Sequence, residues 1–265
     1  MGLYKNFLVR ISGNRTMQRL IEKQVRVLNH ALGVGAGGEF AESGEYVLFD
    51  LLYERCQPPF CIFDVGANKG QFLAYALGRM KVETYSIHCF EPSLETFRML
   101  QASCTADTRI HLNNLGLGGE KSESLLYSNA KGAEGASLTK RDLGHFGISF
   151  DHSETVHIET LDNYCRDKGV ERISILKLDV EGHELDALKG STEMIARKAI
   201  DMILFEFGGC NIDTRKFFRD YWQFFQNTGM DLYRVTPSGY LAKITSYREE
   251  YEQFLCSNFI ALKSR

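Results

Sequence analysis

The sequence predicts an α/β protein with a doubly wound, mostly parallel sheet, and two observations lead to that fold class. Short, continuous apolar runs such as FCIFDV (60–65) and DMILFEF (201–207) are typical of strands that are covered on both faces. Segments with helical spacing separate these runs, for example SLETFRMLQAS (93–103). Because strands and helices alternate along the chain, parallel pairing in a Rossmann-like sheet is favoured.

Residues 1–58 are expected to form a helical segment ahead of this sheet, and the segment could act as a lid. Apolar residues at helical spacing predict an amphipathic helix over 14–32. A second helix is predicted over 43–56, with Ser43 as its N-cap and two prolines after its end. Glu45 lies in this segment and would close over a bound ligand if the lid moves.

Residues 59–265 are expected to form the main domain. The Gly-, Ser- and charge-rich stretch 115–160 interrupts its alternation and predicts a hairpin excursion with a mobile loop, where specificity commonly lies. The aromatic residues of the helix over 214–229 are expected to be core. The other expected helices cover 70–80, 93–103 and 183–190, and the expected strands cover 60–65, 84–92, 109–114, 172–180, 201–207 and a closing antiparallel pair, 231–244 with 254–264.

Composition excludes several classes of function. The chain has 265 residues, of which 44% are hydrophobic and 25% charged, and its formal net charge is −3. Acidic and basic residues are mixed throughout, so we expect no nucleic-acid partner, and no apolar run approaches the roughly 20 residues of a transmembrane segment. The seven cysteines are odd in number and none is spaced C-x-x-C, which favours reduced core thiols in a cytoplasmic protein. No pattern indicates an oligomeric state.

Two glycine-rich stretches compete as the loop that holds a cofactor. LGVGAGGEF contains Gly33, Gly35 and Gly38 in the spacing G-x-G-x-x-G, but it follows a predicted helix. FDVGANKGQF follows a predicted strand and opens a helix, which is the context in which backbone amides face the crevice at the sheet edge. We therefore expect Gly66 and Gly70 to form the cofactor turn, and the earlier glycines to end a helix and let the chain fold against the main domain.

Acidic residues at the ends of the predicted strands indicate which kind of cofactor binds. They would form a rim that repels a pyrophosphate and attracts a cationic cofactor such as S-adenosylmethionine, with its sulfonium and ammonium groups. Glu91 ends the second strand, 21 residues after Gly70, where a carboxylate can accept both ribose hydroxyls. The rim consists of Asp64, Glu91, Asp179 and, just beyond the fourth strand, Glu181.

Several motifs resemble the FkbM-type S-adenosylmethionine-dependent methyltransferases in order and spacing. They are FDVGANKGQF, HCFEPS, NNLGLG, IETLDNY, and ILKLDVEGHELDALKG followed by ILFEF, and together they cover roughly residues 40–210. The resemblance implies the class I methyltransferase fold, in which a seven-stranded sheet has an antiparallel last strand. It also implies methyl transfer to a hydroxyl oxygen of a sugar, a glycan or a secondary metabolite such as a polyketide.

The resemblance also assigns residues to the cofactor. The first motif would hold the methionine part, the acid after the second strand would hold the ribose, and the fourth-strand motif would lie beside the reacting methyl group. The matching positions are Asp64, Gly66, Ala67, Asn68 and Gly70 in the first motif, Glu91, Pro92 and Ser93 in the second, Asn114 beside the adenine in the third, and Asp179, Glu181 and Gly182 in the fourth.

Methyl transfer to a hydroxyl needs an aligned acceptor and a group that takes its proton. Our first candidate for this general base is Asp179, the second is Glu206 at the end of the fifth strand, and the third is His183 at a helix start. Asp179, Glu181 and Glu206 could instead bind Mg²⁺, but we expect no metal. Two other functions stay open: an NAD-type oxidoreductase, disfavoured by the missing third glycine and the acidic rim, and a catalytically silent protein that keeps the fold for binding.

Overall fold

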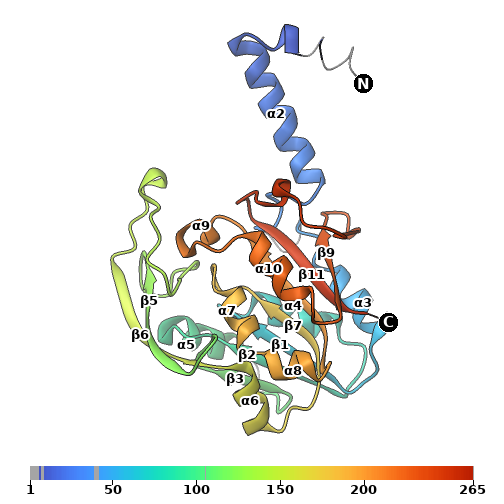
Figure 1. The fold of residues 1–265 in the computed structure, drawn as a ribbon. Helices are drawn as coiled ribbons and strands as arrows, with labels where there is room; N and C mark the ends of the chain where they lie inside the picture. Colours follow the sequence, from blue (N-terminus) through green and yellow to red (C-terminus); the bar gives the residue numbers. More distant parts are fainter. Residues whose placement is uncertain (1–5, 7–8, 39–41, 105, 265) are drawn as a thin grey trace.

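The computed structural model describes residues 6, 9–38, 42–104 and 106–264 (Figure 1). Its centre is an eight-stranded sheet in which the neighbours from β8 to β3 pair in parallel, whereas β11 is antiparallel to both β8 and β9. The predicted α/β fold with a mostly parallel sheet is therefore confirmed. In sheet order the strands are β10 (Leu241–Lys243), β9 (Met230–Val235), β11 (Ser257–Lys263), β8 (Ile200–Phe207), β7 (Ile173–Leu178), β1 (Phe60–Val65), β2 (Tyr85–Phe90) and β3 (Ile110–Asn113).

This sheet has one strand more than the seven that the family resemblance implies. The additional strand is β10, which pairs antiparallel with β9 at the edge of the sheet. The sequence pattern treats 231–244 as a single strand, but the backbone turns back at Gly239, where φ is +76° and the amide donates to the carbonyl oxygen of Thr236 at 2.8 Å. The last strand, β11, is antiparallel as expected.

Helices cover both faces of the large sheet, and each face has its own hydrophobic core. One core joins the sheet to α6, α7, α8 and α10, and the other joins it to α3, α4 and α5. Between them lies β7, all of whose residues are buried, which explains its continuous apolar sequence. The helices are α3 (Val47–Arg55), α4 (Gln71–Arg79), α5 (Leu94–Ser103), α6 (Leu161–Lys168), α7 (Glu184–Lys189), α8 (Thr192–Ala196), α9 (Cys210–Thr214) and α10 (Phe218–Phe225), with a short 3₁₀ helix, η2 (Glu249–Tyr251).

The aromatic residues of α10 belong to the core, as the sequence predicts. Phe218, Tyr221 and Phe225 are buried, and the ring of Tyr221 stacks on that of Phe205 in β8 with 5.0 Å between centroids. Phe217, at the helix start, remains exposed. This face of α10 therefore stabilises the sheet and contributes no substrate platform.

The chain between β3 and α6 forms a second, smaller sheet with the order β4-β6-β5. It consists of β4 (Gly116–Leu117), β5 (Ser122–Ser128) and β6 (His152–Glu159), of which β5 and β6 form an antiparallel hairpin. The 3₁₀ helix η1 (Gly144–Phe146) lies in the connection between them. In Figure 1 this green to yellow unit stands beside the large sheet and extends toward the end of the molecule where α9 lies.

The N-terminal segment contains α2 (Arg15–Ala31), which projects away from the rest of the molecule in Figure 1 and has no buried residue. The prediction of Ser43 as the N-cap of the next helix is wrong, because α3 begins at Val47, after Tyr46. The preceding residues form a turn instead. Gly44 has a φ of +81°, and a Cβ on it would lie 2.0 Å from the carbonyl oxygen of Thr236. Close packing of this turn on the main domain delays the start of the helix.

The glycine stretch after α2 ends that helix and packs against the main domain, as expected. Gly33 has a φ of +88°, and a Cβ on it would lie 2.0 Å from the carbonyl oxygen of Val235 in β9. Gly37 donates its amide to the carbonyl oxygen of Cys256 at 3.0 Å, and a Cβ there would lie 2.6 Å from the Cys256 sulfur. These glycines therefore allow two backbones to approach closely.

Among the described helices, none combines the length and the apolar character that crossing a membrane requires. All seven cysteines are reduced thiols, as predicted, but two of them face a pocket and have polar partners, unlike the core thiols that the sequence predicts. Cys210 and Cys256 line a pocket and interact with Glu181 and Glu206 respectively. The cytoplasmic location that the cysteines suggest stays a prediction.

Candidate active site

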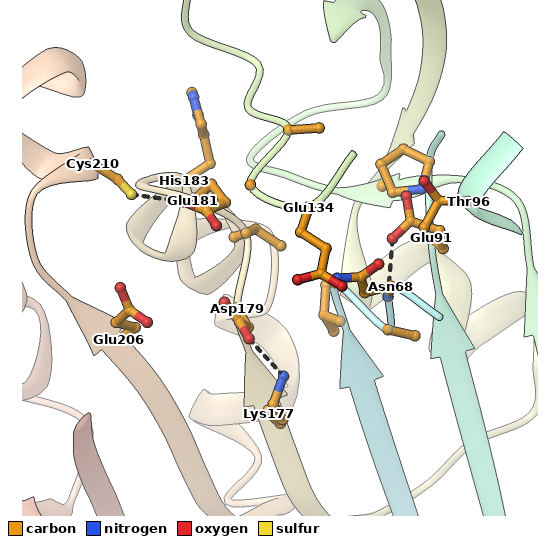
Figure 2. Close-up of a pocket in the computed structure, with 18 of the residues that line it drawn as sticks. Asn68, Glu91, Thr96, Glu134, Lys177, Asp179, Glu181, His183, Glu206 and Cys210 are labelled. Carbon is orange, nitrogen blue, oxygen red and sulfur yellow. Dashed lines mark hydrogen bonds and ion pairs between the residues drawn. The ribbon is translucent and has the colours of Figure 1, made fainter. Parts of the chain in front are cut away.

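A pocket of about 700 Å³ lies at the carboxyl ends of β1, β2, β7 and β8. In a parallel sheet these ends share one edge, and the loops that follow them surround a crevice. The walls of this pocket also come from residues distant in sequence: Gly37, Gly38 and Glu45 of the N-terminal segment, the stretch around Glu134 in the smaller sheet's connection, and Cys256. Figure 2 draws 18 of the residues that line the pocket.

The turn between β1 and α4 forms one wall of the pocket. Gly66, Ala67 and Asn68 line it, and Gly66 and Asn68 have left-handed φ values of +82° and +47°. A Cβ on Gly66 would lie 1.8 Å from the carbonyl oxygen of Asp179, so this position requires glycine even without a ligand. Gly70 also has a positive φ, +93°, but it packs toward Leu100 and does not line the pocket.

Glu91, directly after β2, is held by two backbone amides. Asn68 donates to one carboxylate oxygen at 3.0 Å and Ser93 donates to the other at 2.9 Å (Figure 2 shows the first of these bonds). Burial nevertheless raises the pKa of Glu91 to about 7. Pro92 lines the pocket beside it. The result is a carboxylate of fixed orientation that changes charge near neutral pH.

Two predicted cofactor residues support this loop from outside the pocket. The Asn114 amide group donates to the backbone oxygens of Glu91 and Pro92, at 2.9 and 3.0 Å. The Ser93 hydroxyl donates to Glu154 of β6 at 2.7 Å, so it does not cap α5, although Ser93 occupies the N-cap position. Neither side chain is among the groups that line the pocket.

Lys177 is the most important residue that sequence reasoning missed. It is buried in β7, and its ammonium group lies 3.4 Å from Asp64 and 3.1 Å from Asp179. Although burial lowers the pKa of Lys177, the carboxylates of Asp179, Asp64 and Glu45 raise it overall. The signal in the sequence was a lysine in the apolar run ILKLDV, two residues before Asp179 and therefore on the same face of the strand.

Asp64 lies beneath the pocket and does not line it. Its side chain is completely buried, and burial raises its pKa, partly offset by Lys177. The Lys177 ammonium group, 3.4 Å from one Asp64 oxygen, is the charged partner of this carboxylate. No described residue donates a hydrogen bond to the amide oxygen of Asn68, a residue that lines the pocket. Asn68 therefore has an acceptor that the protein itself leaves unused.

Glu181 connects β7 to the smaller sheet's loop. It has a φ of +52°, and its carboxylate accepts from Arg141 at 3.1 Å and from the Cys210 thiol (Figure 2). Arg141 also lies 3.4 Å from Asp213 in α9. Burial raises the pKa of Glu181. Arg141 was not predicted, because its place in a long polar connection gives no local signal.

Glu206 and Glu45 also line the pocket, and Glu206 interacts with Cys256. Burial, and then the negative charges of Asp179 and Glu181, raise the pKa of Glu206 well above its ordinary value. Burial also raises the pKa of Glu45 to about 7, while Asn258 donates to its carboxylate at 2.6 Å. Both glutamates therefore hold protons more tightly than exposed glutamates do.

His183 lines the pocket, but both of its ring nitrogens are engaged. Nδ1 lies 3.0 Å from the Asp186 carboxylate and Nε2 lies 3.0 Å from the Thr139 hydroxyl. Figure 2 shows its side chain pointing away from Asp179 and Glu206. The next residue, Glu184, is buried and accepts from two backbone amides at the start of α7.

The described residues contain no group of three or more His, Cys, Asp or Glu side chains arranged to hold a metal ion. Asp179, Glu181 and Glu206 all line the same pocket, yet Lys177 and Arg141 bind the first two. Lys177 and Arg141 would therefore compete with a metal ion for these two carboxylates.

Comparisons with known proteins identify the family of the chain. A model of the methyltransferase FkbM domain matches residues 64–232, more than half of the chain. Hexuronic acid methyltransferase AglP from Haloferax volcanii is 26% identical over 164 residues, which are 62% of this chain and 62% of that protein. Methyltransferase 1 from Beauveria bassiana is 25% identical over 167 residues, 55% of this chain and 66% of that protein. The matches thus span about two thirds of the length of these curated relatives.

A solved FkbM methyltransferase is among the structures that were found to be similar to this chain. The crystal structure of methyltransferase FkbM from Methylobacillus flagellatus covers 91% of this chain and 60% of its own, with 15% identity and a TM-score of 0.47. The family assignment rests on the domain model, whose span begins at Asp64 and includes Glu91, Asp179 and Glu206. On this evidence the chain belongs to the FkbM methyltransferase family.

Proposed function

We propose that the protein transfers a methyl group from S-adenosylmethionine to a hydroxyl oxygen of a sugar or a related small molecule. One observation carries the proposal: acidic residues at the ends of four neighbouring parallel strands converge on one pocket or its floor. They are Asp64, Glu91, Asp179 and Glu206. A cavity with this charge is suited to a cationic donor, and it is unsuited to the pyrophosphate of NAD.

The residues of the pocket fit S-adenosylmethionine, which supplies an activated methyl group on a sulfonium when it is bound. The unused amide oxygen of Asn68 complements an ammonium group, which carries three donors, and the buried carboxylate of Asp64 lies in the strand that leads into the same turn. The fixed carboxylate of Glu91 is suited to accept from two ribose hydroxyls. Together they form a cofactor half of the pocket at β1 and β2.

The other half of the pocket, around Glu181, Glu206 and Cys210, is then left for the acceptor (Figure 2). Asp179 lies between the two halves in Figure 2, which is where an acceptor hydroxyl would meet the methyl donor. We propose that Asp179 takes the hydroxyl proton, with Glu206 as the second candidate. His183 is a weaker candidate because both ring nitrogens already have partners.

Changing Glu91 to Gln should weaken S-adenosylmethionine binding by roughly 10- to 100-fold, because charge-assisted hydrogen bonds to the ribose are lost. The pKa of Glu91 is about 7, and the hydroxyls need the ionised form. The Kd of the wild-type protein should therefore rise about tenfold per pH unit below pH 7 and level off above it. The Gln variant should lose this pH dependence. Isothermal titration calorimetry between pH 5.5 and 8.5 measures both effects.

Glu120→Gln, an exposed change of the same kind, is the matched control and should bind like the wild type. If the Glu91 variant bound S-adenosylmethionine as tightly as the wild type does, the carboxylate would not hold the ribose. Tight binding of NAD with none of S-adenosylmethionine would instead support the oxidoreductase alternative. Binding without any methyl transfer would support a catalytically silent protein.

The charges of the acceptor half favour an uncharged sugar. The lysine and the arginine among the described pocket residues are both ion-paired: Lys177 with Asp64 and Asp179, and Arg141 with Glu181 and Asp213. A uronic acid would therefore bring its carboxylate near Asp179 and Glu181 without an unpaired lysine or arginine to neutralise it. The relative AglP is named a hexuronic acid methyltransferase, so this chain is expected to differ from it in acceptor.

Transfer of labelled methyl groups should therefore be at least about tenfold more efficient with neutral glycosides than with the matching uronides, since one unfavourable buried charge contact is worth more than 1.4 kcal/mol. The assay compares kcat/KM for pairs such as a glucoside and a glucuronide. A preference for the uronide would contradict the argument from charge. Transfer to an amine in place of any hydroxyl would contradict the proposed oxygen specificity.

A further inference from the structure

The helix α2 is the one long helix of the described chain with no buried residue. In Figure 1 it extends beyond the rest of the molecule, and it is joined to the main domain at its C-terminal end. There, the Asn29 side chain donates to Gln253 at 3.3 Å. A helix of 17 residues with no buried side chain would be marginal in water, so its sequence is expected to serve a contact outside this chain.

One side of α2 is apolar and largely exposed. With about 100° of rotation per residue, its large apolar side chains cover an arc of roughly 160°, interrupted by Gln24. Such a stripe normally faces a core, but here Leu28 is 62% exposed and Val27 is 57% exposed. The apolar face consists of Met17, Leu20, Ile21, Val25, Val27, Leu28 and Ala31.

A basic flank lies directly beside the apolar face. Four permanently charged side chains and a histidine fall within an arc of roughly 80°. They are Arg15, Arg19, Lys23, Arg26 and His30. The single acidic residue of α2, Glu22, lies at the edge of this arc. Basic and apolar residues are therefore separated on two adjoining surfaces of one helix, although the whole chain has a net charge of −3.

We propose that α2 binds the surface of an anionic membrane. A basic amphipathic helix of this kind lies in the interface with its apolar face among the acyl chains, and its basic residues are attracted by anionic headgroups. A second copy of the chain complements α2 less well. If two α2 helices paired antiparallel about a two-fold axis, their basic flanks would lie on the same side and repel each other. If they paired in parallel, Glu22 is the one acidic residue of α2 that could neutralise the basic flank of the other copy.

Membrane binding through α2 would hold the pocket near the surface. The helix ends at Ala31, and Gly37, a few residues later, already lines the pocket and packs against Cys256. The chain between them is fixed by backbone bonds, including the one from Val34 to the Asn29 carbonyl oxygen at 2.8 Å. The helix is therefore tied closely to the pocket wall rather than by a long linker.

The test is flotation of the full chain with vesicles. We expect binding to vesicles of phosphatidylcholine mixed with phosphatidylglycerol, little binding to phosphatidylcholine alone, and a loss of binding near 0.5 M salt, where screening is strong. The double variant Leu20→Glu/Leu28→Glu should abolish binding. Arg19→Gln/Arg26→Gln should lower the partition coefficient by roughly tenfold or more.

The matched control is Arg98→Gln/Arg166→Gln, which removes the same charge from exposed positions on α5 and α6 and should bind vesicles like the wild type. Because α2 has no buried residue, all variants should melt within about 2 °C of the wild type. The proposal would be overturned if the wild type failed to bind anionic vesicles, or if both α2 variants bound them as well as the wild type does. A dimer in analytical ultracentrifugation that Leu20→Glu/Leu28→Glu converts to a monomer, with no vesicle binding, would overturn it in favour of a second copy.

Discussion

Replacing Asp179 with Asn should lower kcat by roughly 10²–10⁴-fold, because the acceptor hydroxyl loses the group that takes its proton. Asp179 directly follows β7, its side chain is 46% exposed, and it lies between the two halves of the pocket in Figure 2. The amide oxygen of the Asn variant can still accept from Lys177, so the ion-pair network loses one charge but keeps its shape. Initial rates with labelled S-adenosylmethionine and a neutral glycoside measure the effect.

The same experiment separates the three candidate bases. Glu206→Gln should lower kcat by about tenfold or less. Burial keeps Glu206 protonated to a higher pH, so the substitution removes a polar contact and not the group that takes the proton. His183→Gln should change kcat by no more than about threefold. The Kd for S-adenosylmethionine should change little in all three variants. A large loss in the Glu206 variant with a nearly unchanged Asp179 variant would make Glu206 the base.

The fold was predictable because its signals are local. FCIFDV is a continuous apolar run followed at once by a turn, and the strand in the structure has the same bounds, Phe60–Val65. The context of the two glycine stretches was equally local, since one follows a helix and the other a strand. The boundary of α3 was not predictable from Ser43, because the turn before it is fixed by contacts with Thr236, almost two hundred residues away.

The candidate site was predictable mainly where a side chain sits at or just after a strand end. Glu91, Asp179 and Glu206 could be placed in this way, since parallel strands end at one edge. Glu45, which the lid hypothesis brings over a ligand, also lines this pocket, whereas Arg141 reaches it through tertiary packing that no periodicity in the sequence indicates. Gly66 had been assigned to a close approach of the cofactor, whereas the structure gives a second reason, the carbonyl oxygen of Asp179.

Lys177 should be the most sensitive position for stability. Lys177→Met should lower the free energy of unfolding by about 3–5 kcal/mol, because removing one partner of a buried ion pair leaves uncompensated charge. Here two carboxylates are left, Asp64 with no exposure at all and Asp179 close by. Urea unfolding at pH 8 measures the loss. Lys189→Met, an exposed lysine with a distant partner at 3.9 Å, is the control and should change the free energy by less than about 0.5 kcal/mol.

The pH dependence distinguishes this electrostatic cause from lost packing. Burial raises the pKa of Asp64 in the folded protein, and the loss of Lys177 raises it further. The folded variant is therefore more stable at low pH, where Asp64 is protonated, and it loses this stability as the pH rises and Asp64 must ionise. The difference between the variant and the wild type should therefore be smaller at pH 5 than at pH 8. Adding Asp64→Asn to Lys177→Met should restore part of the stability, which a double-mutant cycle would quantify. The loss of unfolding free energy could instead be the same at both pH values and not be relieved by Asp64→Asn. That result would mean that Lys177 acts through packing of its aliphatic chain, for example over the Phe72 ring, rather than through charge.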